Sequence, residues 1–135
     1  MASRTEAYVD TSAFIAALDR SDSHHIHFAR LFSAPPSALF TSTLVIAEGH
    51  GWFLRRYDPR RALEFLNFIR ALTPLIVIPY EDGDTLLTIP LLSKFSDQRI
   101  TLADAHGLLM MKARRIKACW STDRHLGLTG VPLVL

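Results

Sequence analysis

The sequence predicts an α/β fold with a small, mostly parallel central sheet. Short apolar segments of strand type alternate with longer segments of helical periodicity along the 135 residues. Such alternation is typical of α/β units, in which helices cover both faces of a parallel sheet. No repeat, low-complexity tract or Gly/Ser linker interrupts the chain, and its length suits one hydrophobic core. We therefore expect a single domain over residues 1–135.

The first half of the chain holds two strand signals, each followed by helical periodicity. Ala7-Tyr8-Val9 is an apolar run that ends at a polar break, after which Thr11 or Ser12 is expected to cap a helix. Pro59 stands where a later helix begins, a favoured first-turn position. In order, we expect a strand at 7–9, helices at 13–18 and 25–32, a strand at 38–41, and helices from 42 or 43 to 57 and from 59 to 71.

The second half of the chain repeats this alternation of strand and helix signals. The β-branched apolar run between Pro74 and Pro79 predicts a buried strand. Pro90 is expected either to kink or to divide the helical segment that contains it. In order, we expect a strand at 75–78, helical structure within 82–95, a helix at 101–115, and strands at 116–120 and 131–135.

Composition excludes several classes of protein. Hydrophobic residues make up 49% and charged residues 21% of the chain, close to the globular average, which argues against disorder, collagen and coiled coil. No apolar run reaches the roughly 20 residues that span a bilayer, so no membrane association is expected. The first residues lack the features of a signal peptide, and the single cysteine, Cys119, has no internal partner. A cytoplasmic location is therefore expected.

The net charge of +2 says little, but the basic residues are clustered. Two clusters stand out, and each is large enough to neutralise a few phosphates. On charge alone, solvated helix ends are the favoured explanation. The clusters are Arg55, Arg56, Arg60 and Arg61, and Lys112, Arg114, Arg115 and Lys117.

Four acidic residues occupy corresponding positions in the predicted elements. Asp10 and Asp123 follow the first and fourth strands, and Asp104 lies in the first turn of a helix. Glu48 lies about one and a half turns into another helix. The carboxyl ends of parallel strands line one crevice, and the helices that follow begin at the same edge. We therefore expect the four carboxylates to converge.

Convergence of like charges requires compensation. Two charges about 4 Å apart repel by roughly 4 kcal/mol at an effective dielectric constant near 20. A divalent cation offsets this repulsion, and a set of oxygen ligands favours Mg²⁺, with Mn²⁺ as the alternative, over Zn²⁺. Such a cation acts well on phosphodiesters, and the chain has no Gly-rich phosphate loop for nucleotide hydrolysis. Nucleic-acid cleavage is the chemistry that fits best.

The same residues resemble the motifs of the PIN-domain nucleases. Val9-Asp10-Thr11-Ser12 is similar to the first motif of that family, and Glu48 stands at its second acidic position. Leu102-Ala103-Asp104-Ala105 resembles the third motif. Ser121-Thr122-Asp123-Arg124-His125-Leu126 resembles the fourth, with Leu126 where an aromatic residue is frequent. All four occur in order, and the length suits the VapC toxins of bacterial and archaeal toxin–antitoxin pairs.

The resemblance carries several expectations. It implies a PIN-like three-layer sandwich and a Mg²⁺-dependent endoribonuclease that is dimeric and inhibited by a small cognate antitoxin. Asp10, Asp104 and Asp123 would hold the metal, and Glu48 would complete the site or help to order a water. Ser121 would take the place of a small polar residue that contacts the acids. Asp97 either joins the outer part of the site or caps the helix that follows it.

Other interpretations of these residues stay open on sequence alone. Asp10 is also a good helix cap, and Glu48 is also suited to a salt bridge with an arginine. Trp52 and Phe53 suit either base stacking or, as we favour, contact with another protein. The competing functions are a non-catalytic nucleic-acid or protein-binding module, and a metal-dependent DNA nuclease or phosphatase that uses the same acids.

Overall fold

The computed structural model describes residues 6–35, 38–73 and 75–134 and has the α/β architecture that the sequence predicts. Its centre is a five-stranded, wholly parallel sheet in the order β3-β2-β1-β4-β5. The strands are β1 (Glu6–Val9), β2 (Ala38–Ser42), β3 (Leu75–Ile78), β4 (Cys119–Trp120) and β5 (Leu133–Val134). Leu135, the last residue of the predicted fifth strand, lies outside the described residues.

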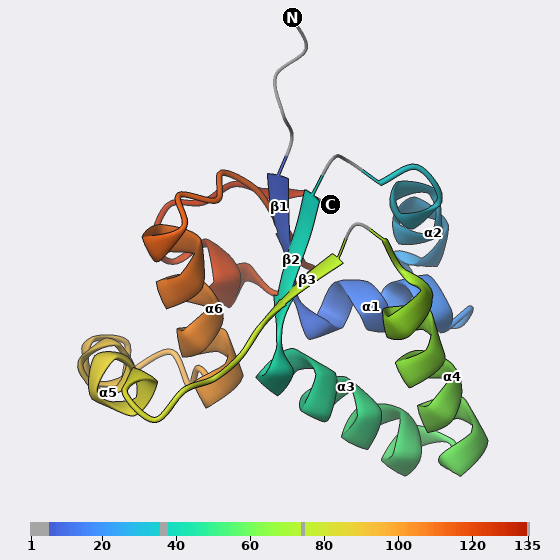
Figure 1. The fold of residues 1–135 in the computed structure, drawn as a ribbon, viewed down its shortest axis with the longest axis horizontal. Helices are drawn as coiled ribbons and strands as arrows, with labels where there is room; N and C mark the ends of the chain where they lie inside the picture. Colours follow the sequence, from blue (N-terminus) through green and yellow to red (C-terminus); the bar gives the residue numbers. More distant parts are fainter. Residues whose placement is uncertain (1–5, 36–37, 74, 135) are drawn as a thin grey trace, which may run out of the picture.

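Six α-helices and one 3₁₀ helix connect the strands. They are α1 (Thr11–Leu18), α2 (His25–Ser33), α3 (Thr43–Arg56), α4 (Pro59–Ala71), α5 (Asp84–Lys94), α6 (Leu102–Ala113) and η1 (Arg124–Gly127). In Figure 1, α5 and α6 lie on one side of the sheet and α1, α2 and α4 on the other. The three-layer fold class is therefore confirmed. None of the helices in the described ranges is both long and apolar enough to cross a membrane.

The core lies mainly between the sheet and the helices α1 to α4. Its largest members are aromatic side chains that stack or meet edge to face, which adds stabilisation to the area that they bury. Phe14 contacts both Phe32 and Phe65, and Phe32 also packs edge-on against Trp120 of β4. Phe53 stacks on Phe65 and is only 1% exposed. Phe53 is therefore a core residue, and the expectation that it forms a docking surface is wrong.

Two glycines allow helices to approach closely. A Cβ atom at Gly49 of α3 would collide with the ring of Phe65 on α4. A Cβ atom at Gly107 of α6 would lie only 3.0 Å from the ring of Tyr8 on β1. Gly107 lies one turn after Asp104, so the close approach of α6 to β1 also determines how near Asp104 lies to the end of that strand.

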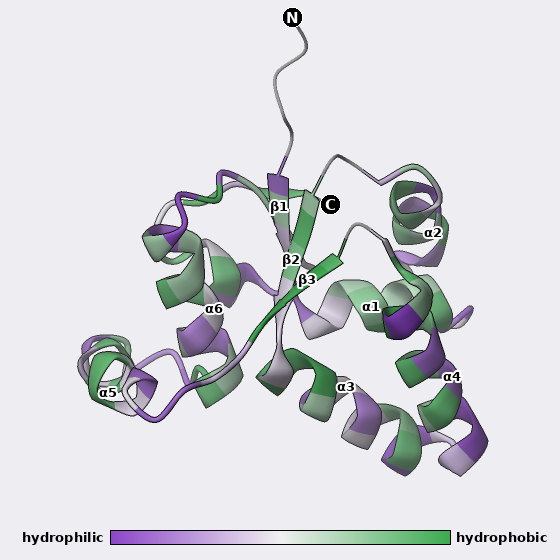
Figure 2. Ribbon diagram, viewed as in Figure 1, coloured by the Kyte–Doolittle hydropathy of each residue, from purple (hydrophilic) through white to green (hydrophobic). Residues whose placement is uncertain are grey.

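Two local expectations are wrong, and a third is decided in part. The run 75–78 forms a strand as predicted, but β3 is at the edge of the sheet, with Ile76 45% and Val77 38% exposed. β3 is hydrophobic along its whole length (Figure 2), so the apolar run alone cannot distinguish an edge strand from a central one. The cap of α1 is Asp10 rather than Thr11 or Ser12, because the Asp10 carboxylate accepts from the Ser12 amide. Pro90 lies within a single helix, α5, so it does not divide the segment, and the alternative of a kink stays a prediction.

Candidate active site

The candidate site lies where the strand order of the sheet reverses. The chain builds β1, β2 and β3 outward in one direction, and then returns past β1 to add β4 and β5 on the other side. The crossover helices lie on opposite faces for the two directions (Figure 1), as right-handed crossovers require. Ligands of open α/β sheets bind at the carboxyl ends of the strands beside such a reversal. Asp10 follows β1 and Asp123 follows β4, so both flank this point.

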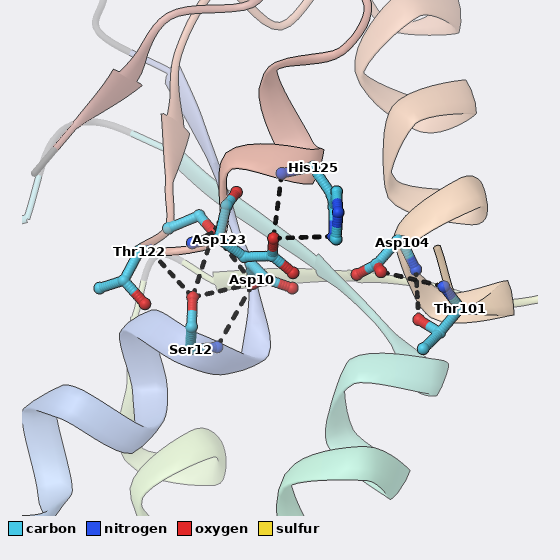
Figure 3. Close-up of polar contacts among 8 residues, drawn as sticks. Asp10, Ser12, Thr101, Asp104, Thr122, Asp123 and His125 are labelled. Atoms are coloured by element: carbon cyan, nitrogen blue, oxygen red, sulfur yellow. Dashed lines mark hydrogen bonds and ion pairs between the residues drawn. The ribbon is translucent and has the colours of Figure 1, made fainter. Parts of the chain in front are cut away.

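Asp10 is held at the end of the central strand by three donors. Its backbone amide continues the sheet ladder by donating to Trp120 O at 3.0 Å. Its Oδ2 accepts from Ser12 Oγ at 2.9 Å, from Ser121 Oγ at 3.0 Å and from the Ser12 amide at 3.4 Å (Figure 3). The residue is 4% exposed. Burial raises the pKa of its carboxyl group to about 6, with a further rise caused by Asp104, while the two serine donors oppose the change.

Two serines join the ends of β1 and β4. Ser121 is fully buried, and its Oγ accepts from the Asp123 amide at 2.9 Å. Ser12 Oγ lies 3.1 Å from Ser121 Oγ and accepts from the Thr122 amide at 3.0 Å. These bonds fix the orientation of Asp10 against the segment that carries Asp123. Ser121 is thus found where the sequence predicts it, in contact with an acid.

Asp104 belongs to a capping box at the start of α6. Thr101 Oγ1 accepts from the Asp104 amide at 3.1 Å, and Asp104 Oδ2 accepts from the Thr101 amide at 3.0 Å. This motif satisfies two backbone donors and fixes the side chain. Asp104 is 6% exposed, and burial raises its pKa, with Asp123 raising it further and the Thr101 bonds opposing the rise. Its carboxylate faces the Asp10 and Asp123 side of the sheet edge (Figure 3).

Asp123 caps η1 and binds a histidine. Its Oδ1 accepts from the His125 amide at 3.0 Å and lies 3.1 Å from His125 Nδ1. Three potential ligand atoms lie within 4.8 Å of one another, one each from Asp104, Asp123 and His125. One metal ion can span this separation. The structure therefore brings Asp104 and Asp123 together as predicted and adds His125 to them.

The three aspartates form one electrostatic unit, and no lysine or arginine of the described residues pairs with it. The charge of Asp104 raises the pKa of Asp10, and the charge of Asp123 raises the pKa of Asp104, so each interaction disfavours ionisation. Within the described ranges, only His125 forms an ion pair with any of the three. A buried carboxylate is costly unless it is paired or bound to a metal. The donor set, oxygen-rich with one imidazole, therefore fits a divalent cation.

Glu48 lies outside this hydrogen-bonded group. It is half-buried in the second turn of α3, which begins at the same edge of the sheet, after β2. Among the described residues it forms neither a hydrogen bond nor an ion pair, so the alternative of a salt bridge to an arginine is not realised. Its part in the site stays a prediction.

Asp97 is exposed in the turn between α5 and α6, where its side chain accepts from Gln98 Nε2 at 3.2 Å. It does not cap α6, because Thr101 occupies that position. The capping interpretation of Asp97 is therefore wrong. Its place in the outer part of the site stays a prediction.

Sequence reasoning did not select Ser12 or His125 as site residues. Each lies two residues after an aspartate that follows a strand and caps the next helix. A polar side chain at this spacing folds back on the capping carboxylate, a local signal that the sequence does contain.

The chain belongs to the PIN domain family: the family model matches residues 7–130. The resemblance to that family is thus confirmed. No curated protein matches the chain significantly. Among solved structures, the fold is similar to the crystal structure of VapC20 of Mycobacterium tuberculosis, described as a toxin that cleaves the sarcin-ricin loop. The TM-score is 0.84 with 21% sequence identity, over 93% of this chain and 95% of the other.

Proposed function

We propose that this protein is a Mg²⁺-dependent endoribonuclease and the toxin of a type II toxin–antitoxin pair. The observation that carries the proposal is the meeting of Asp10, Asp104 and Asp123 at one edge of the sheet, with no lysine or arginine paired to them among the described residues. The PIN domain match and the similarity to an RNA-cleaving toxin support RNA as the substrate.

Each residue has a role that follows from its environment. Asp10, Asp104 and Asp123 would hold the metal, Mg²⁺ or alternatively Mn²⁺, with His125 beside Asp104 and Asp123. When bound, such a cation polarises the phosphodiester and lowers the pKa of a water molecule. Ser12 and Ser121 orient Asp10. Glu48 lies in α3, which starts from the same edge of the sheet, and would help to order the attacking water. Hydrolysis adds that water across the P–O bond and leaves one phosphate end and one hydroxyl end.

Cleavage of RNA by matched variants tests the proposal. Asp10→Asn and Asp104→Asn keep the shape of the side chain but remove its charge, so both should stay folded and lose Mg²⁺-dependent cleavage. Asp82→Asn, at an exposed position in the turn before α5, is the matched control and should cleave like wild type. If either site variant cut RNA at the wild-type rate, the site would be wrongly assigned.

A panel of RNA, DNA and small phosphoesters, each with and without EDTA, decides between this function and its competitors. Cleavage of RNA alone is expected. Metal-dependent cleavage of DNA or of small phosphoesters instead would indicate a DNA nuclease or a phosphatase. Binding of nucleic acid without any cleavage would indicate a non-catalytic module.

We further propose a homodimer that forms through β3 and α5. β3 is hydrophobic along its length (Figure 2), and α5 carries exposed apolar side chains, with Leu86 76%, Leu87 57% and Ile89 55% exposed. On the edge strand β3, Ile76 and Val77 are exposed as well. Large exposed apolar patches are rare on monomers and mark interaction sites, which supports these elements as the interface.

A small cognate antitoxin is the second expected partner. Exposed Leu54 and Leu63, with half-buried Trp52, offer apolar contacts for it on α3 and α4. The product of the neighbouring reading frame should bind this chain and suppress its RNA cleavage. We place this pair in the cytoplasm, where RNA is present and a lone thiol such as Cys119 stays reduced.

A further inference from the structure

A second candidate site lies at the opposite edge of the sheet from the carboxylates. It is a cavity of about 580 Å³, within the range of small-ligand sites. Its walls come from the end of α6, the segment before β4, the loop before β5 and the end of α5. In a parallel sheet, segments that precede the strands lie at the amino-terminal edge, whereas Asp10 and Asp123 follow their strands.

The charged side chains that line this cavity are all positive: Lys94, Lys112, Arg115 and Lys117. No aspartate or glutamate lines it, and none of the four cations forms an ion pair among the described residues. The other basic cluster differs, because Arg60 and Arg61 both pair with Glu64. The cavity thus gathers four cations that no acidic side chain of the described residues balances, which suits an anion.

The floor of the cavity is apolar. Met111 and Ile116 are buried there, and Leu128 and Val131 add half-buried aliphatic surface. An apolar floor beneath a ring of cations matches a ligand unit that has a flat base and a charged phosphate. Arginine and lysine contacts to phosphate, together with contacts to the base, are how proteins hold single-stranded nucleic acid.

The backbone conformation of Arg115 allows its charge to be removed without a loss of stability. Its φ is +55°, in the left-handed region, and the turn that ends α6 is closed by Ile116 N donating to Met111 O at 2.9 Å. Glycine is the favoured residue at such a helix end. Replacement of Arg115 by glycine therefore removes a charge from the cavity and relieves backbone strain at the same time.

We propose that this cavity binds the phosphates of the RNA strand that the carboxylates act on; this inference rests on the proposed function. Asp104 and Lys112 are eight residues apart on α6 (112 − 104 = 8), which corresponds to about 12 Å. At about 3.4 Å per stacked nucleotide, that is roughly four nucleotides. The cavity thus holds the strand a few nucleotides away from the scissile bond.

The test measures RNA binding separately from cleavage. A fluorescein-labelled single-stranded RNA of about 12 nucleotides is titrated with protein in EDTA, and anisotropy is read at several salt concentrations. Lys112→Gln/Lys117→Gln should bind about tenfold more weakly, with the slope of log K against log salt reduced by about 1.4, because each lost phosphate contact removes about 0.7. Arg115→Gly should also bind more weakly, while its melting temperature equals or exceeds that of wild type.

Arg30→Gln/Arg70→Gln is the matched control. Both arginines are exposed in the last turns of α2 and α4, so the double variant loses the same charge from helix ends elsewhere. It should keep the wild-type affinity and salt slope. Equal weakening in the control, or wild-type binding by both cavity variants, would overturn the proposal. Release of the RNA by polyglutamate at equal charge concentration would also overturn it, in favour of an acidic protein segment.

Failure of the inference and failure of the proposed function give different results. If wild type cleaves RNA and the cavity variants bind it normally, the nuclease stands and the cavity has no role. If wild type binds RNA through the cavity but cleaves nothing, the cavity stands and the nuclease assignment fails. Absence of RNA binding by wild type would overturn the cavity proposal outright.

Discussion

Asp10 performs two tasks with one side chain. It caps α1 through the Ser12 amide, and it also belongs to the group of acids at the edge of the sheet. The capping interpretation of this residue is therefore confirmed, and its role in holding a metal stays a prediction. The second task has an energetic cost in the absence of metal, because the pKa of about 6 means that the folded protein resists ionisation of this carboxyl group.

The pH dependence of the metal-free protein should reveal that cost. The carboxyl group titrates near 3.8 when unfolded and near 6 when folded, so the folded state keeps a proton that the unfolded state releases between these values. Stability should therefore fall as pH rises from about 4 to 6, by up to about 3 kcal/mol. Asp10→Asn carries no charge and should lack this contribution, which makes it more stable than wild type above pH 6.

Urea unfolding in EDTA, from pH 5 to pH 8, measures this effect as the difference between wild type and Asp10→Asn. The difference should grow in favour of the variant as pH rises and level off above about pH 6 to 7. A difference that is constant over the range would show that burial does not raise the pKa of Asp10.

The main site residues can be predicted from sequence, but their contacts cannot. Asp10, Asp104 and Asp123 are predicted because their positions depend only on strand ends and helix starts, which local patterns reveal. The bonds from Ser12 and Ser121 to Asp10 depend on which strands are neighbours and on side-chain rotamers. The pairing of His125 with Asp123 depends on the 3₁₀ turn that follows β4.

At the scale of the elements, periodicity predicts where helices and strands occur, but not how they are buried. All five strands and all six α-helices appear near their expected positions because each pattern is local. The exposure of β3 follows instead from the strand order, which no local run encodes. Likewise, the local pattern could not decide whether Pro90 divides its helical segment, because proline disfavours a helix interior and yet lies inside α5.

The glycine pair in α3 offers a prediction at this scale. Gly49→Ala should destabilise the protein by about 1 to 3 kcal/mol, because the new methyl group collides with the Phe65 ring in a packed core. Gly51→Ala is the control: its Cβ atom would meet only the end of the flexible Arg55 side chain, and alanine favours helix by about 1 kcal/mol. Thermal or urea unfolding compares the two. Similar effects of both substitutions would contradict this account of the α3–α4 contact.

At the scale of the whole molecule, right-handed crossovers explain why residues far apart in sequence meet. The crossovers from β1 to β2 and from β2 to β3 run in one direction, and the crossover from β3 to β4 runs back. As a result, β4 lies beside β1. The ends of these two strands then present Asp10 and Asp123 to each other, and α6, which leads into β4, brings Asp104. The reversal point is thus the feature of the fold that creates the site.

The exposed apolar face gives a prediction about assembly. Leu86→Glu/Leu87→Glu should convert a dimer into a monomer, because charges on α5 would be desolvated in the interface, while the exposed positions leave the fold intact. Light scattering coupled to size exclusion measures the mass, and circular dichroism checks the fold. A wild-type protein that is monomeric at micromolar concentration, or a variant that stays dimeric, would show that this face is not the interface.

Direct measurement of metal binding tests the central claim most sharply. Calorimetric titration of Mg²⁺ into the metal-free protein near neutral pH should show binding that Asp104→Asn weakens by about tenfold or more and that Asp82→Asn leaves unchanged. The same ranking should hold for Mn²⁺. If Asp104→Asn and wild type bound the ion with equal affinity, the acids at the edge of the sheet would not form a metal site, and the nuclease mechanism would lose its basis.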